Sequence, residues 1–251
     1  MNPLQAAEVG WRAARVNALP MVILWTAAGT LVLAYFFLPG CARLLRPLAE
    51  WQTAWGVHAA FLNQAFFSGL VPSLFFFAVR GIRTRRPFLK ALLQIAWGGS
   101  WGVICWRFFM LQGEWFGTGH DGATLALKTM VDQFVWTPLV VSPLSSLFYL
   151  WMGGDFDVPS VRAACRRGFL GNVMLPNLVS GWCVWIPVIF IVYAFPRELQ
   201  IQIHGFICAL WTLLCRQIGR QVSAPRAPVR ARLPCCSRSG AQTDATAPRS
   251  T

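Results

Sequence analysis

The stretch VIFIVYAF, residues 188 to 195, is apolar or aromatic throughout and shows no alternation of apolar with polar positions. It ends an apolar segment that begins at about residue 168. Such a segment is long enough to cross the hydrocarbon of a bilayer, which takes about 20 residues. A membrane β-strand would alternate over about 10 residues, so this segment is predicted to be a helix, which satisfies its own backbone polar groups in lipid.

Composition extends this prediction to the whole chain. Of its 251 residues, 56% are hydrophobic and 12% are charged, which is typical of a membrane protein rather than a soluble domain. Similar apolar segments span about residues 20–38, 53–79, 88–111, 124–151, 168–195 and 199–219. Prolines that predict kinked or tilted helices interrupt them at Pro72, Pro138, Pro143, Pro176 and Pro187. The predicted fold class is all-α, a polytopic integral membrane helix bundle with about six hydrophobic segments and four to six full crossings.

Basic residues predict how these segments cross. Lys and Arg are retained on the cytoplasmic or matrix side of a membrane. With six crossings, one side holds the arginine clusters at 12–15, 80–86, 162–167 and 216–249, and the other side holds only Arg43, Arg46 and Arg197. This asymmetry favours six crossings with both termini inside.

The charge pattern also divides the chain into two parts. Residues 1–220 are predicted to form the membrane-embedded helical domain, and residues 221–251, rich in Pro, Ser, Ala and Arg, a disordered basic tail. This tail either lies on anionic headgroups or acts only as an orientation signal. Its Cys235 and Cys236 are either modified or simply solvated. The net charge of +13 falls in short clusters between apolar runs, so no nucleic-acid partner is predicted.

Polar residues gather inside the fourth segment, in LKTMVDQFVWTPLVVSP, residues 127 to 143. Lys128 and Asp132 are four residues apart and share a helix face, and pairing would lower the cost of about 2.5–3.5 kcal/mol that a charge pays at mid-bilayer. Gln133 adds a hydrogen-bonding group, and Pro138 frees a carbonyl one turn upstream. Two interpretations stay open: a structural staple between helices, or the wall of an aqueous pore.

Other polar residues within the segments are weak signals one by one, but together they predict a shared interior cavity. They are His58, Asn63, Gln64, Arg107, Asn172, Asn177 and His204. Small residues in WGGSWG, residues 97 to 102, predict a close approach of another helix. No metal-ligand spacing, phosphate loop or catalytic motif is found, so neither a cofactor, a metal nor an enzymatic activity is predicted.

The spacing K-x-x-x-D-Q-x-x-x-x-P, from Lys128 through Asp132 and Gln133 to Pro138, resembles the signature of the Mpv/PMP family, the twenty-two-kilodalton peroxisomal membrane protein family. Further positions similar to that family, within about residues 97 to 217, are Gly153, Trp182, Trp185, Pro187, Phe195, Pro196 and Trp211. The chain departs from the family where Pro187 stands one residue late, where VIFIVYAF replaces polar residues, and where Gln200 replaces an arginine. The resemblance is therefore to a divergent member.

The resemblance implies a small multi-helix protein of the mitochondrial inner membrane or the peroxisomal membrane, with channel activity; a bacterial inner membrane is the other compartment left open. The leading prediction is a weakly selective channel or pore for small solutes, with Lys128, Asp132, Gln133 and Pro138 in or beside the pathway. The alternative is a non-transporting scaffold in which Lys128 and Asp132 only stabilise helix packing. Expected partners are the lipid bilayer and small solutes or ions, and a homo-oligomer stays open.

Overall fold

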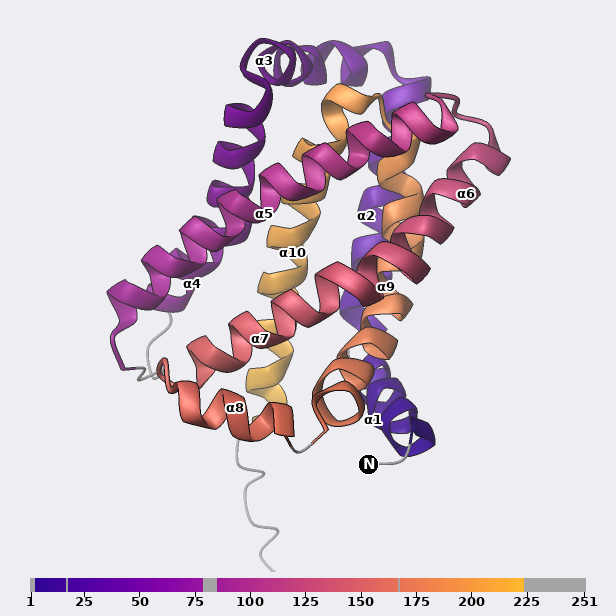
Figure 1. Cartoon of the computed structure of the whole chain (residues 1–251). Helices are drawn as coiled ribbons and strands as arrows, with labels where there is room; N and C mark the ends of the chain where they lie inside the picture. The colour runs from indigo at the N-terminus through magenta and orange to yellow at the C-terminus, as the bar shows by residue number, and fades with distance from the viewer. Residues whose placement is uncertain (1–2, 17, 79–84, 167, 224–251) are drawn as a thin grey trace, which may run out of the picture.

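The computed structural model describes residues 3–16, 18–78, 85–166 and 168–223. Every regular element in these ranges is helical, which confirms the predicted all-α fold class (Figure 1). All six predicted apolar segments are helical, and they run between the two ends of the molecule that lie at the top and the bottom of Figure 1. The predicted tail falls almost wholly on residues 224–251, outside the described residues.

The segments that run between the two ends are built from eleven helical pieces. They are α2 (Ala18–Phe37), the second half of α3 (Pro39–Gln64) with η1 (Ala65–Leu70) and α4 (Val71–Ala78), α5 (Pro87–Phe116), α6 (Gly122–Val131) with η2 (Asp132–Val141) and α7 (Ser142–Gly153), η3 (Leu170–Met174) with α9 (Leu175–Ala194), and α10 (Arg197–Ser223). Within the described ranges, four stretches are long and apolar enough to cross a membrane: Ala18–Phe37, Pro87–Phe116, Gly122–Gly153 and Leu170–Ala194. This is a multi-span helical architecture.

Large apolar side chains on the outside of the bundle fit a surface that faces lipid. Leu139 is 72% exposed, Leu19 is 67% exposed and Leu92 is 64% exposed, each on a different long helix. The interior is mainly apolar, with Leu24, Val188 and Ile201 fully buried, but it also holds buried polar side chains such as Gln112 and Asp132. Exposed leucines on several of the helices that are long and apolar enough to cross a membrane fit a surface in contact with hydrocarbon.

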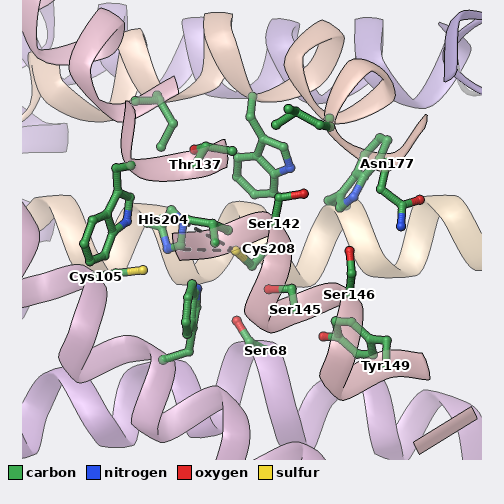
Figure 2. Close-up of a pocket in the computed structure, with 18 of the residues that line it drawn as sticks. Ser68, Cys105, Thr137, Ser142, Ser145, Ser146, Tyr149, Asn177, His204 and Cys208 are labelled. Carbon is green, nitrogen blue, oxygen red and sulfur yellow. Dashed lines mark hydrogen bonds between the residues drawn. The ribbon is translucent and has the colours of Figure 1, made fainter. Parts of the chain in front are cut away.

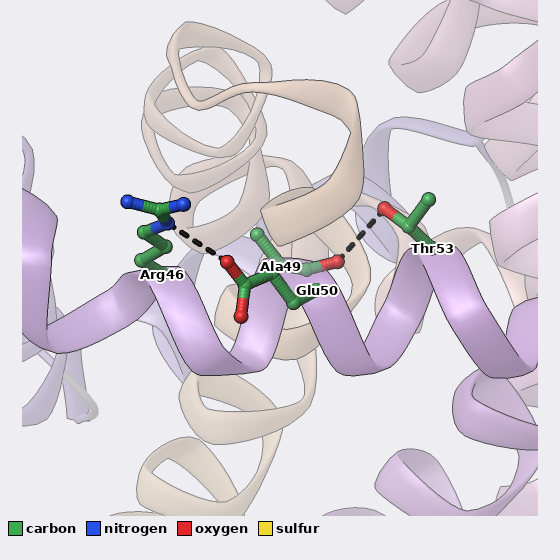
Figure 3. Close-up of polar contacts among 4 residues, drawn as sticks. All are labelled: Arg46, Ala49, Glu50 and Thr53. Atoms are coloured by element: carbon green, nitrogen blue, oxygen red, sulfur yellow. Dashed lines mark hydrogen bonds and ion pairs between the residues drawn. The ribbon is translucent and has the colours of Figure 1, made fainter.

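Three further helical stretches lie at the two ends of the bundle, and the sequence did not predict them. They are α1 (Pro3–Val16), the first half of α3, and α8 (Val158–Arg166). The two halves of α3 meet at Gly56, whose φ of 46° and ψ of −113° break the helix, so that the first half runs along the top of the bundle and the second half turns into it (Figure 1). The first half carries exposed contacts of its own, Arg46 to Glu50 at 2.8 Å and the Thr53 hydroxyl to the Ala49 carbonyl at 2.9 Å (Figure 3).

Arginines separate between the two ends as six crossings require. α1 with Arg12 and Arg15, the start of α5 with Arg86, and α8 with Arg162 lie at the bottom of Figure 1, and this end is called the arginine-rich end below. The first half of α3 and the start of α10 lie at the opposite end and carry Arg43, Arg46 and Arg197. Residues 80–84, 167 and 226–249, which complete the predicted clusters, lie outside the described residues.

Prolines explain why the described helices contain π-helical stretches. η1, η2 and η3 each end two residues before a proline, namely Pro72, Pro143 and Pro176. A proline ring clashes with the carbonyl four residues earlier, and one inserted residue relieves the clash. The amide before each proline accordingly bonds to a carbonyl five residues back, Val71 to Phe66, Ser142 to Thr137 and Leu175 to Leu170.

Neighbouring helices supply donors to carbonyls near these prolines, because proline has no amide hydrogen to offer them. Gln94 Nε2 donates to the carbonyl of Ser68, four residues before Pro72, at 3.1 Å. Trp182 Nε1 donates to the carbonyl of Gln133, five residues before Pro138, at 2.7 Å. The kinked segments are therefore tied to α5 and α9 through the backbone groups that the prolines leave free.

Glycines let α5 approach α3 and η1 as closely as the sequence predicted. A Cβ added at Gly98 would lie 2.9 Å from the Gln64 carbonyl oxygen, and one at Gly102 would lie 2.5 Å from that of Ala60. Ordinary contacts of a Cβ begin at 3.4 Å. Only glycine allows this backbone separation, which is the usual basis of close helix packing in membranes.

Candidate functional site

A cavity of about 740 Å³ lies between η1, α5, η2 with α7, α9 and α10 (Figure 2). On α5 the lining includes Gln94, Trp97, Trp101, Cys105 and Phe109, which recur every three or four residues and so lie on one face. A helix rises about 22 Å between the first and the last of these residues. The cavity is therefore elongated along the bundle, and its volume is typical of a small-molecule site.

The cavity wall combines aromatic rings with hydroxyl groups. Its aromatic residues include Trp97, Trp101, Phe108, Trp136, Trp185 and Trp211, and its hydroxyl residues include Ser68, Thr137, Ser142, Ser145, Ser146 and Thr212. Two ring stacks hold the wall in place: Trp97 on Phe148 with centroids 4.2 Å apart, and Phe108 on Trp136 at 4.3 Å. The serines of α7 point into the same space as Ser68 (Figure 2). A solute inside would meet apolar faces beside a row of hydrogen-bonding groups.

Asp132 lines this cavity and is only 4% exposed. Its Oδ2 accepts from the Tyr193 hydroxyl at 2.8 Å, and its Oδ1 accepts from Gln133 Nε2 at 2.8 Å and from the Thr137 hydroxyl at 3.4 Å. Tyr193 belongs to α9, so the carboxylate joins two crossings. These hydrogen bonds replace part of the hydration that the carboxylate loses on burial.

Lys128 does not form the predicted ion pair with Asp132. The ion pairs between described residues are Arg12 with Glu8, Arg46 with Glu50 and Lys90 with Asp155. Lys128 is 2% exposed, and its Nζ lies 5.9 Å from the centroid of the Tyr193 ring. The tyrosine thus contacts both residues, its hydroxyl at the aspartate and its ring face at the lysine, and it takes the bridging role that the sequence gave to a direct pair.

Beyond Asp132, toward the end opposite the arginine-rich end, the interior is polar but packed. Gln112 Nε2 donates to the Lys128 carbonyl at 3.2 Å, and Gln202 Nε2 donates to Gln52 Oε1 at 2.7 Å. Among described residues, four buried glutamine oxygens have no hydrogen-bond partner, those of Gln112, Gln133, Gln200 and Gln202. Buried amide oxygens are rarely left so, since each costs about 1–3 kcal/mol. Gln112, Gln200 and Gln202 lie outside the cavity lining, whereas Gln133 is part of it.

Of the polar residues expected to share a cavity, Asn177 and His204 line it, and His58, Arg107 and Asn172 do not. Asn63 and Gln64 instead bind α10: Asn63 Nδ2 donates to the Ile201 carbonyl at 2.9 Å, and Gln64 Nε2 lies 2.7 Å from His204 Nδ1. The Ser68 hydroxyl donates to Gln64 Oε1 at 2.5 Å, which leaves the amide nitrogen facing the imidazole. His204 Nδ1 therefore accepts, and the ring is the neutral form with its hydrogen on Nε2.

The residues that carry the family resemblance have different structural roles. Trp182 donates to the Gln133 carbonyl, whereas Trp185 and Trp211 line the cavity. Pro187 lies inside α9, and Pro196 separates α9 from α10, where the amide of Leu199 donates to its carbonyl at 2.8 Å. Sequence reasoning missed Tyr193, which is hidden in an apolar run, and the serines of α7, whose spacing in SPLSS was the available signal.

Fold and cavity together define a class: a multi-span α-helical membrane protein with a partly polar interior. Comparison of the chain with protein-family models, with curated proteins and with solved structures gave no match. Membership of the Mpv/PMP family therefore stays a prediction from the residue spacing.

Proposed function

We propose that this protein is a weakly selective channel or pore for small solutes, in which the cavity is the wide part of the pathway. The observation that carries the proposal is a cavity that follows about 22 Å of α5 and is lined partly by hydroxyl groups, inside a bundle with large exposed apolar side chains. Hydroxyl groups that face an internal cavity can bind water or a solute, which supports a pathway through the bundle.

Asp132 is proposed to mark the point at which the pathway is closed. On its far side Lys128, Gln112 and Gln202 are buried and packed, so conduction requires this segment to take up water. The glutamine oxygens without partners favour that step, because hydration would satisfy them. Breaking the hydrogen bond between Tyr193 and Asp132 is the change that would join the cavity to this segment.

The Mpv/PMP resemblance supports the same proposal and adds a compartment: the mitochondrial inner or the peroxisomal membrane, or the inner membrane if the protein is bacterial. The proposed activity is non-enzymatic, since transport needs no chemical step in the cavity. The arginine-rich end is proposed to face the cytoplasmic or matrix side.

A scaffold is the second candidate, and one observation favours it. The Asp132 carboxylate accepts hydrogen bonds from donors on two helices, as in a staple that fixes helix packing. A scaffold predicts that removal of the carboxylate lowers the yield of folded protein, and it predicts no conductance.

Planar-bilayer recording of the purified full chain separates the two candidates. Three proteins are compared at matched density: the wild type, Asp132→Asn, and Asp121→Asn as a control with the same substitution at an exposed N-cap of α6. A channel predicts currents from the wild type and the control, with ion preference altered in Asp132→Asn. Well-folded wild-type protein that gives no current would support the scaffold instead.

A further inference from the structure

The end of the cavity that holds Asp132 combines one carboxylate with aromatic rings from three helical elements. Asp132 and Trp136 come from η2, Phe109 from α5, and Trp185 from α9. Trp136 follows Asp132 by four residues and therefore lies on the same helix face. Trp185 and Phe109 each lie 5.7 Å from His204 between ring centroids, so these two rings flank the imidazole, while Trp136 stacks on Phe108.

Charge sets this end apart from an ordinary apolar pocket. Among the described lining residues, Asp132 is an acid and no lysine or arginine is present. His204 adds no positive charge, because its Nδ1 accepts a hydrogen bond from Gln64. Lys128, whose Nζ lies 5.9 Å from the centroid of the Tyr193 ring, is not part of the lining. The lining as a whole therefore carries a negative charge.

Aromatic faces and a carboxylate attract the same kind of ligand. The negative face of an indole or phenyl ring binds cations, and alkylated ammonium ions bind best because they are poorly hydrated and their methyl groups pack on the ring. A carboxylate adds direct attraction in a site of low dielectric constant. An anion would meet repulsion from Asp132, and a neutral solute would use only the apolar contacts.

We propose that the cavity binds small alkylated ammonium ions, with the cationic head beside Asp132 and between Trp136 and Trp185. The hydroxyl row of Ser142, Ser145 and Ser146 is then placed to bind a polar substituent that extends from the head toward the arginine-rich end. This inference rests on the proposed function, since it names the solute class of the same cavity. It requires binding only, and no covalent step.

A pair of isosteric probes tests the charge. Choline and 3,3-dimethylbutan-1-ol have the same shape, and only choline is charged. Each is titrated by ligand-observed NMR onto the full chain in maltoside micelles, with empty micelles as the blank. Choline is expected to bind at least about tenfold more tightly than its neutral isostere, which corresponds to one favourable charge contact. Equal affinity for the two probes, or no binding of choline, would overturn the proposal.

Variants then place the bound cation. Asp132→Asn is expected to weaken choline about 30-fold while leaving the neutral isostere unchanged, and Trp136→Leu to weaken choline about 2- to 30-fold. The controls are Asp121→Asn and Trp115→Leu, both exposed and outside the cavity. Choline affinity that falls equally in variants and controls would refute the site. If Asp132→Asn does not fold, the choline affinity of Trp136→Leu is compared with that of Trp115→Leu, and equal affinities would refute the site.

The binding experiment is independent of transport. Choline binding without current would support the proposed ammonium site and refute the proposed channel. Current from a protein that binds choline no more tightly than its isostere would support the channel and refute the ammonium site.

Discussion

Replacing Gly102 by alanine should destabilise the bundle, because α5 touches α3 at this point. The new Cβ would lie 2.5 Å from the Ala60 carbonyl oxygen and 2.5 Å from Gln64 Cβ. Since ordinary contacts begin at 3.4 Å, the two helices must separate by about 0.9 Å, and the carbonyl, being backbone, cannot turn away. Overpacking of this kind costs about 1–3 kcal/mol.

A matched glycine isolates that steric cost. Gly29 lies within α2, and a Cβ there would meet nothing within 4 Å. Gly29→Ala should therefore gain about 0.5–1 kcal/mol from helix propensity alone. Gly102→Ala has the same gain, so the difference in free energy of unfolding between the two variants measures the clash, about 1–3 kcal/mol.

Equilibrium unfolding of both variants in mixed micelles, followed by tryptophan fluorescence and circular dichroism, provides the measurement. Choline binding and current should also weaken in Gly102→Ala, because α5 carries a wall of the cavity. If Gly102→Ala proves as stable as Gly29→Ala, α5 and α3 do not pack as closely as described. The position of α5 as a wall of the cavity would then be wrong as well.

Three further outcomes are expected. In sealed vesicles, single-cysteine proteins that retain Cys41 or Cys165 should react with an impermeant thiol reagent from opposite sides, because α3 and α8 lie at opposite ends; labelling from one side would contradict six crossings. Trp182→Phe should lose about 0.6–2 kcal/mol of stability, since the Gln133 carbonyl loses its donor; unchanged unfolding would contradict this. The backbone N–H of Thr124 donates to Asp121 and lowers the pKa of its carboxyl group. The free energy of unfolding of the wild type should therefore fall below about pH 4 relative to that of Asp121→Asn, and the same pH dependence of unfolding in both proteins would contradict this cap.

The apolar segments could be predicted from their hydrophobicity, but the break in α3, which depends on the backbone conformation of a single glycine, could not. The segment ending in VIFIVYAF is η3 with α9, close to the predicted limits of 168 and 195, because a long apolar run has only one way to cross lipid. The break at Gly56 was not predicted, since a glycine in a helical pattern carries no sign of its φ. The second crossing therefore begins a few residues after the predicted residue 53.

Only part of the candidate site was predictable: of the four residues predicted for the pathway, Asp132 and Gln133 line the cavity, whereas Lys128 and Pro138 do not. Asp132 and Gln133 stood out because polar residues in an apolar segment are costly, and both line the cavity. The pairing of Lys128 with Asp132 rested on helical spacing alone, which gives a shared face but no partner on another helix. Tyr193 meets both from α9, 61 residues away from Asp132, and no local pattern reveals a contact of that range.

The polar ties between the second crossing and α10 also bear on the order in which the protein is made. Asn63 binds Ile201 and Gln64 binds His204, over separations of 138 and 140 residues. During synthesis these amides enter the membrane long before α10 exists, so nascent chains pass through a period with unsatisfied polar groups in lipid. A chain truncated before residue 197 would never leave that state, which makes the last helix the step that completes assembly and the point at which quality control can distinguish finished from unfinished protein.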